Sequence, residues 1–368
     1  MKCGERMINK TDIKQRFTRL EKIMSQKGCQ NLIAYSNAAK PDNVFYLSGY
    51  NLYAGEAWAV FNQKGEVSLW FTEAWDAERA KEQSWAEQIL LLEPGQLPTL
   101  PTEGVFLSGL NIMPRKHAGQ LQHVLSDAKN GNSILEEAVL VRTTGDMNYL
   151  RKAAQIADQG FQSAVEVLRP GITQLELLAE IEYTMRRLGA TDNFQLMASG
   201  THNKSMAVGT EKQIESGDVL LFEITPAVDS ITYSAQLCRT ITMGKASDVI
   251  KEKYAILKEA MESAIDIIRP GVTICEVFEV QNKVFRREGY GEYCMPPYMR
   301  TRGHGLGLAQ AFNVDADNHL PLEEGMSLVI HPNQYIPEIG YLTLGEMILV
   351  TASGCESLTT LDHNLVEK

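Results

Sequence analysis

Two segments of the chain, one hundred residues apart, are near copies of each other. VLRPGITQLELLAEIEYTMRRLG and IIRPGVTICEVFEVQNKVFRREG align without a gap. In both, the Pro-Gly pair ends one helical segment, and a threonine is placed to cap the next helix, with a glutamate three residues later completing a capping box. The same helix, turn and helix are therefore expected twice. The matching positions are Arg169/Arg269, Pro170/Pro270, Gly171/Gly271, Thr173/Thr273, Glu176/Glu276, Arg186/Arg286, Arg187/Arg287 and Gly189/Gly289.

The repeat continues into two expected strands. IESGDVLLFEITP lies over LEEGMSLVIHPNQ, so that Gly217 matches Gly325 and Glu223 matches His331. Two copies of one unit usually pack about a pseudo-twofold axis, and equivalent positions near that axis face each other. We therefore expect Glu223 and His331 to meet there.

Length, composition and charge exclude several classes of protein. The chain has 368 residues, of which 44% are apolar, and it contains no apolar run long enough to span a membrane. Six scattered cysteines without a C-x-x-C pair argue against a disulfide framework or a thiolate zinc site. The start MKCGERMINK has no apolar stretch behind it, so the expected compartment is the cytoplasm. A net charge of −11 opposes binding to nucleic acid or an anionic membrane.

The first part of the chain alternates expected strands with expected helices. The segments 31–36, 43–49, 57–62 and 67–73 have strand composition, and 76–90 and 113–129 have helical periodicity. The polar stretch VRTTGDMN then precedes a helix expected over 149–168. We place the boundary there, giving an α/β domain over 1–145 and a second domain over 146–368.

A glycine-rich stretch holds the first candidate for chemistry. In TRGHGLGL, residues 301–308, His304 lies between Gly303 and Gly305. Glycines allow backbone or ligand to come close, and a histidine held there can serve as a metal ligand or a general base. A histidine that is simply hydrogen-bonded in a tight turn fits the motif equally well.

With these motifs, the chain resembles the creatinase, prolidase, aminopeptidase P and methionine aminopeptidase superfamily. RPGIT, MASG, IESGDVLLFE, CRTITMG, GHGLGL and LEEGMSLVIHP carry the resemblance in the second part, and NVFYLSGYN carries it in the first. It implies a creatinase-type α/β domain followed by a pita-bread domain with an internal pseudo-twofold repeat.

The resemblance also implies a metal centre that this sequence does not keep. Peptidases of the superfamily hold two divalent metals with two Asp, one His and two Glu. Carried over residue by residue, those positions are Glu223, Gln236, His304, His331 and Gly345. Only His304 is unchanged. Two adjacent metals need bridging carboxylates, which an amide cannot replace, so no dinuclear centre is expected.

Two readings of the remaining groups stay open. Glu223, His304 and His331 form a two-histidine, one-carboxylate set that suits a single divalent ion. Alternatively, and as we favour, no cofactor binds, the same three residues are catalytic, and Glu223 orients an imidazole that moves protons. Glu346 follows Gly345 and would need a one-residue bulge to reach the same face of its strand.

Other residues are expected to contact substrate. They are Gln236, Glu346, Arg302, His202 and Tyr298, with Arg302 able to grip a carboxylate through two hydrogen bonds. Two substrate-handling histidines of the peptidases fall on Met206 and Ala311, which weakens the expectation of peptide cleavage. The histidines at 117, 123, 319 and 363 receive no role.

Three functions follow, in order of preference. The first is a creatinase-like hydrolase or lyase acting on a C–N or related bond of a small polar metabolite. The second is an Xaa-Pro aminopeptidase or prolidase relative that uses one metal, and the third is a non-catalytic pita-bread module that binds a ligand. By resemblance a homodimer is expected, in which residues 49–58 of one subunit reach toward the site of the other.

Overall fold

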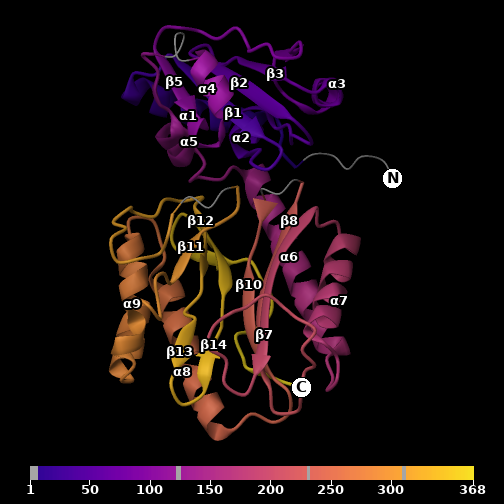
Figure 1. Ribbon diagram of the computed structural model, residues 1–368. Coiled ribbons are helices and arrows are strands. Elements are labelled where there is room, and N and C mark those ends of the chain that lie inside the picture. Colours follow the sequence, from indigo (N-terminus) through magenta and orange to yellow (C-terminus); the bar gives the residue numbers. More distant parts are fainter. Residues whose placement is uncertain (1–6, 122–125, 230–232, 309–311) are drawn as a thin grey trace. The chain divides into compact units, whose positions relative to one another are not determined.

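The structure is a computed structural model that describes residues 7–121, 126–229, 233–308 and 312–368 (Figure 1). The chain divides into two compact units, Ile8–Val139 and Leu140–Lys368, the latter together with Met7. This division falls a few residues before the expected boundary at 145.

The first unit is a mixed sheet accompanied by helices. The sheet order is β4-β3-β2-β1-β5-β6, with antiparallel pairing of β1 to β2 and of β2 to β3 and parallel pairing elsewhere. Its core includes the fully buried side chains of Tyr35, Trp58 and Leu107. The elements are α1 (Lys10–Lys27), β1 (Asn31–Asn37), α2 (Asp42–Ser48), β2 (Glu56–Asn62), β3 (Val67–Phe71), α3 (Ala74–Gln83), β4 (Gln88–Leu91), β5 (Val105–Ser108), η1 (Leu110–Ile112), α4 (Arg115–Leu121), β6 (Lys129–Asn130) and α5 (Asn132–Ala138).

Three expectations for this unit need correction. Residues 43–48 lie in helix α2 rather than in a strand, because Pro41 and Asp42 favour the start of a helix and Gly49 ends it after two turns. The helix expected over 76–90 stops at Gln83, and its last residues enter β4. The helix expected over 113–129 is described only as Arg115–Leu121, since residues 122–125 lie outside the described part.

The second unit contains two helical hairpins and the strands between them. Helices α6 (Thr144–Val167) and α7 (Gln174–Arg187) form the first hairpin, and α8 (Asp248–Ile267) and α9 (Ile274–Arg287) form the second. Figure 1 shows the two hairpins on opposite sides of the strands. Helix α6 begins earlier than the expected residue 149, because Thr143 and Asp146 form a capping box.

The strands of the second unit form two larger sheets and one hairpin. One sheet has the order β17-β10-β8-β7 with β9 beside β8, the other has the order β11-β12-β15-β16, and β13 pairs with β14. The bounds are β7 (Asp192–Gly200), β8 (Val219–Val228), β9 (Tyr233–Ser234), β10 (Leu237–Thr242), η2 (Gly291–Cys294), β11 (Gly303–Gly305), β12 (Ser327–Ile330), β13 (Gln334–Ile336), β14 (Gly340–Leu342), β15 (Glu346–Val350), β16 (Cys355–Ser357) and β17 (Val366–Glu367).

The sequence repeat is a structural repeat down to its hydrogen bonds. The expected capping boxes form at Thr173 with Glu176 and at Thr273 with Glu276. The turn that precedes each box donates from a glycine N–H to a backbone carbonyl just ahead of a strand. Gly171 donates to Ile214 at 2.8 Å, and Gly271 donates to Leu322 at 2.9 Å. The R-P-G-x-T turn therefore fastens each helical hairpin to its own sheet.

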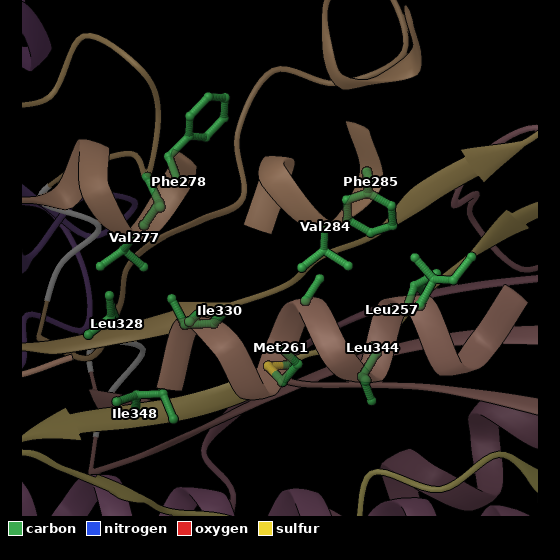
Figure 2. Packing of buried hydrophobic residues seen from close by; sticks show 14 of the residues in the cluster. Leu257, Met261, Val277, Phe278, Val284, Phe285, Leu328, Ile330, Leu344 and Ile348 are labelled. Atoms are coloured by element: carbon green, nitrogen blue, oxygen red, sulfur yellow. The ribbon is translucent and has the colours of Figure 1, made fainter. Parts of the chain in front are cut away.

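The second hairpin packs on the β11-β12-β15-β16 sheet through a continuous apolar layer (Figure 2). Leu257 and Met261 of α8 and Val277 and Phe285 of α9 are buried in it. They meet side chains from the strands, namely Leu328 and Ile330 of β12, Ile348 of β15, and Leu344 just before β15. In the described part of the chain, no helix is long and apolar enough to cross a membrane.

The repeated turn gives a direct test of this framework. Gly171 and Gly271 have φ of 87° and 92°, and an added Cβ at either would have no heavy atom within 4 Å. Gly171→Ala and Gly271→Ala should each lower the free energy of unfolding by about 1–2 kcal/mol, because side chains disfavour this backbone region. Urea unfolding of each variant beside the wild-type protein measures this loss of unfolding free energy.

The control for both turns is asparagine, which adopts the left-handed region more readily than alanine. Gly171→Asn and Gly271→Asn should therefore cost less than the alanine variants. Equal losses for alanine and asparagine would contradict a backbone origin.

Candidate functional site

One row of candidate residues crosses β8 and β10 and continues just beyond the ends of β15 and β12. Cys238 of β10 is the register partner of Glu223 of β8. Cys238 is also bridged to Gly345, with backbone hydrogen bonds of 3.2 and 2.9 Å. Since Ile330 pairs with Glu346, the next position, His331, lies opposite Gly345. We call Glu223, Cys238, Gly345 and His331 the inner row.

This row corrects the expectation that Glu223 and His331 meet directly. They occupy equivalent places, but Cys238 and Gly345 lie between them. The pseudo-twofold axis therefore passes between β10 and β15, which place Cys238 and Gly345 next to it. Three strand spacings along a flat sheet amount to about 14 Å, and a curved sheet brings the side chains closer.

The alternation of side chains along each strand shows which face of the sheets the inner row occupies. Phe222, beside Glu223, packs edge-on against Phe161 of α6 at 5.8 Å. Leu344 and Ile348 on the other sheet belong to the helix-facing apolar layer. Because neighbours on a strand point to opposite faces, the inner row faces away from the helices. Glu223 and His331 are partly exposed on that face.

The two histidines form a contacting pair. The rings of His304, in β11, and His331 lie 5.4 Å apart in an edge-to-face arrangement. His304 Nδ1 is 3.2 Å from the carbonyl oxygen of Gly305. Burial lowers the pKa of His304, and burial together with His304 and Arg302 lowers the pKa of His331 to about 3. Both imidazoles are therefore neutral at pH 7.

The carboxyl group at the other end of the row has the opposite shift. Burial raises the pKa of Glu223 to about 7. Among the described residues, one group donates to it, the thiol of Cys238 at 3.9 Å from Oε2. Gln236 in turn donates from Nε2 to the Cys238 sulfur at 3.4 Å. Burial raises the pKa of Cys238, so it remains a thiol.

Glu346 does not reach this face, in contrast to the expectation that it contacts substrate. It is fully buried on the helix side of β15, where no bulge redirects it. Its carboxylate accepts hydrogen bonds from Arg239 at 3.2 Å and from the Thr359 hydroxyl at 2.7 Å, and it lies 3.0 Å from His363 Nε2. His363 had been given no role, since nothing in its sequence context points to a partner 17 residues away.

Arg302, the expected carboxylate grip, is also inside the protein. Its guanidinium donates to Asn282 at 2.8 Å, to Gln334 at 2.7 Å and to the carbonyl of Asn333 at 2.8 Å. It lies 4.4 Å from the centre of the Phe285 ring. These contacts assign Arg302 to holding the strand segment beside His331 rather than to a ligand.

Two other expected contact residues lie together in an aromatic cluster. His202 packs edge-on against Tyr335 at 5.9 Å, and Tyr298 stacks with Tyr335 at 5.7 Å. Tyr293 contacts both Tyr298 and Tyr335. We call these four residues the tyrosine wall. Tyr293 had not been predicted, because its role depends on the β13–β14 hairpin that carries Tyr335.

The inner row does not fit the two-metal centre that the resemblance implies. The described residues contain no group of three His, Cys, Asp or Glu side chains placed to hold a metal. A Cβ at Gly345 would lie 2.7 Å from both Cβ and Sγ of Cys238, so Cys238 fills the space that a bridging carboxylate needs. The amide of Gln236 is directed to the same sulfur. Glu223, His304 and His331 are likewise not gathered as ligands for a single ion.

Comparison with known proteins places this geometry in context. The sequence pattern described as metallopeptidase family M24 matches residues 148–352, and that of the creatinase/prolidase N-terminal domain matches residues 16–156. The Xaa-Pro dipeptidase of Pyrococcus furiosus is 25% identical over 361 residues, covering 96% of this chain and 100% of the relative. The Xaa-Pro dipeptidase of Pyrococcus horikoshii is 26% identical over 336 residues, covering 89% and 93%.

Solved structures agree on the fold. The prolidase from Pyrococcus horikoshii superposes with a TM-score of 0.83 at 24% identity, covering 95% of this chain and 99% of that one. The Xaa-Pro dipeptidase from Bacillus anthracis gives 0.79 at 25% identity, covering 97% and 100%. The expected resemblance, and the α/β fold of a creatinase-type domain followed by a pita-bread domain, are confirmed.

The buried ion pair between Glu346 and Arg239 leads to a prediction about stability. Glu346→Ala should lower the free energy of unfolding by about 3–5 kcal/mol, because it leaves the Arg239 charge buried without its partner. The pKa of Glu346 is held below its ordinary value by His363 and Arg239 against the opposing effect of burial. Its contribution is therefore complete above about pH 4.5 and is lost as the pH falls through the lowered pKa.

Urea unfolding at pH 7 and at lower pH measures both effects. The control is Glu356→Ala, which removes a partly exposed ion pair with Arg151 at 2.7 Å and should cost less than about 1 kcal/mol. Similar losses for the two variants would contradict a structural ion pair at Glu346.

Proposed function

Because the chain belongs to metallopeptidase family M24, we propose that it is a hydrolase of the Xaa-Pro dipeptidase type that acts on a dipeptide-sized substrate without a dinuclear metal centre. The names of its relatives favour this peptidase alternative over a creatinase-like activity on a small metabolite. The observation that carries the proposal is the inner row, which has at one end a carboxyl group whose pKa is raised to about 7 and at the other the neutral imidazole of His331, which contacts the ring of His304.

The chemistry assigned to the row is general acid and base catalysis. Above pH 7 the ionised Glu223 accepts a proton from water, and the resulting oxygen adds to the carbonyl carbon of the scissile amide. The C–N bond then breaks, and Glu223 returns the proton to the leaving nitrogen. A neutral His331 or His304 donates an N–H to the carbonyl oxygen as negative charge develops there. Gly345 and Cys238 lie between these groups in the inner row.

A second candidate is a non-catalytic module that binds a peptide, and one observation favours it. Gln236 and Gly345 stand where the peptidases of the superfamily have bridging carboxylates, so the chain has lost the groups that those enzymes use to hold their metals. The inner face would then bind a peptide without cleaving it. Binding and cleavage measured side by side separate the two candidates.

The test is proline release from a panel of Xaa-Pro dipeptides, with elemental analysis of protein purified without chelator or affinity metal. We expect substoichiometric Mn, Fe, Co, Ni and Zn, and a rate that survives EDTA. The value of kcat/KM should rise as the pH rises through about 7, because the base is active when ionised. Glu223→Gln should lower kcat/KM by about 10²–10⁴-fold.

The matched control is Glu211→Gln, an exposed carboxylate on the same unit, which should leave kcat/KM unchanged. A rate abolished by EDTA and restored by Mn²⁺ would overturn the metal-free mechanism. Dipeptide binding in equilibrium dialysis without any proline release would establish the non-catalytic binding module instead.

We also propose that the chain is a homodimer, as expected by resemblance. Tyr53, in the loop expected to reach a partner, is 68% exposed and packs edge-on against Trp75, which is 59% exposed. Arg79 lies over the Tyr53 ring at 5.3 Å. Large apolar rings exposed together are typical of interfaces. Light scattering after size exclusion should give twice the mass of one chain. The double variant Tyr53→Ser, Trp75→Ser should lower the measured mass toward that of the monomer. A monomeric mass for the wild-type protein at micromolar concentration would contradict the dimer.

A further inference from the structure

A cysteine and a histidine are in contact at the second R-P-G-x-T turn, away from the inner row. Cys275 Sγ lies 3.2 Å from His319 Nδ1. Cys275 is partly exposed and His319 is exposed, so solvent reaches both side chains. When the imidazole hydrogen is on Nε2, Nδ1 accepts the thiol proton, and the thiolate that remains is the nucleophilic form of cysteine. The two side chains therefore pair a nucleophile with a base.

Backbone hydrogen bonds on both sides of His319 hold the pair in place. The Cys275 N–H donates to the carbonyl of Asn318 at 2.8 Å, and the Ile274 N–H donates to the carbonyl of Leu320 at 3.0 Å. The backbone of His319 lies between these two acceptors and is thereby fastened to the first turn of α9. The contact between sulfur and imidazole is thus built into the framework of the turn.

The sulfur also lies at the end of α9 that favours a negative charge. Cys275 is the second residue of this 14-residue helix, and the positive end of a helix dipole stabilises a nearby anion. The neighbouring carboxylate of Glu276 is directed to the Thr273 N–H at 2.7 Å and to the Thr273 hydroxyl at 2.6 Å. The Thr273 hydroxyl lies 3.2 Å from Cys275 Sγ. A thiolate at this position therefore has an imidazole, a hydroxyl and a helix N-terminus beside it.

The first copy of the repeat shows that this pair is not needed to build the turn. The same backbone hydrogen bonds form there, and the Leu175 N–H donates to the carbonyl of Thr210 at 3.1 Å. Leu175 and Glu211 occupy the places of Cys275 and His319. One framework thus carries an apolar side chain and a carboxylate in the first copy, and a thiol and an imidazole in the second. The chemistry of the second copy is separate from the structure of the turn.

The other cysteines in the described part of the chain have different surroundings. Three of them are buried, and burial raises the pKa of their thiols, which are those of Cys29, Cys238 and Cys294. Cys355 is partly exposed, but its thiol donates to the carbonyl of Ile265 at 3.5 Å, and burial raises its pKa. Among the described cysteines, Cys275 therefore combines an accessible thiol with an adjacent base.

We propose that Cys275 is a modification site at which a small disulfide forms a mixed disulfide with the protein, with His319 as the base. His319 takes the thiol proton, and the Cys275 sulfur attacks one sulfur of the disulfide R–S–S–R. The R–S–S–R bond breaks as the new S–S bond forms, so Cys275 is oxidised and the other half of the reagent is reduced. That half leaves as a thiolate and takes the proton back from His319 as R–SH. A small thiol reverses the step.

The first experiment measures which cysteine reacts and how fast. The full chain with Cys3→Ser, which removes the cysteine outside the described residues, is treated with oxidised glutathione, and peptide mapping by mass spectrometry locates the adduct. We expect the adduct on Cys275, formed at least about 10-fold faster than on Cys355 and released by dithiothreitol. His319→Gln should slow the reaction of Cys275 by at least about 10-fold, because the base is lost.

Cys355→Ser is the matched control, since it removes the other partly exposed thiol of the described residues. It should leave the rate at Cys275 unchanged. An adduct formed on Cys355 in preference to Cys275, equal rates at the two cysteines, or an unchanged rate in His319→Gln would overturn the proposal.

A second experiment moves the pair into the first copy of the repeat, so that the result does not depend on a loss. In a chain with Cys3→Ser and Cys275→Ser, Leu175→Cys is compared with Leu175→Cys combined with Glu211→His. The double substitution should react with oxidised glutathione at least about 10-fold faster than the single one, because the backbone is shared and the base is added. Equal rates would refute the role of His319, even if His319→Gln proved to be destabilised.

Discussion

One backbone bridge determines how the second unit is assembled. Cys238 and Gly345 exchange two hydrogen bonds and join β10 to β15, so two sheets that each belong to one copy of the repeat continue into each other. Each sheet is separately fastened to its own helical hairpin by the R-P-G-x-T turn. The bridge therefore brings the two copies into register, and it sets the order Glu223, Cys238, Gly345 and His331 across the inner face.

Much of this framework could be predicted because its signals are local. The capping boxes at Thr173 and Thr273 and the turns before them depend on residues a few positions apart, and they form as expected. Residues 43–49 were misjudged because their apolar composition suits a strand, while the helix start at Pro41 and Asp42 decided the outcome. The resemblance supplied the fold class, which no single element could have given.

The site was harder to predict because it depends on contacts between distant segments. Alternation along β15 indicated that Glu346 would need a bulge, but its partners come from two other segments: Arg239 from β10, and Thr359 and His363 from the segment between β16 and β17. Arg302 had the chemistry to grip a carboxylate, yet its hydrogen-bonding groups are directed to Asn282, Asn333 and Gln334. The equivalence of Glu223 and His331 was correct in the repeat, but the innermost strands β10 and β15 separate them.

The close packing of Cys238 on Gly345 also constrains how this chain can change over evolutionary time. A glutamate at 345 would place its Cβ 2.7 Å from the Cys238 side chain, so this substitution is disfavoured while the cysteine remains. Effects of substitutions at such contacting positions are not additive. A carboxylate side chain at position 345 therefore requires that the side chain of Cys238 first be shortened or removed. The contact between the two positions thus sets the order in which they can change.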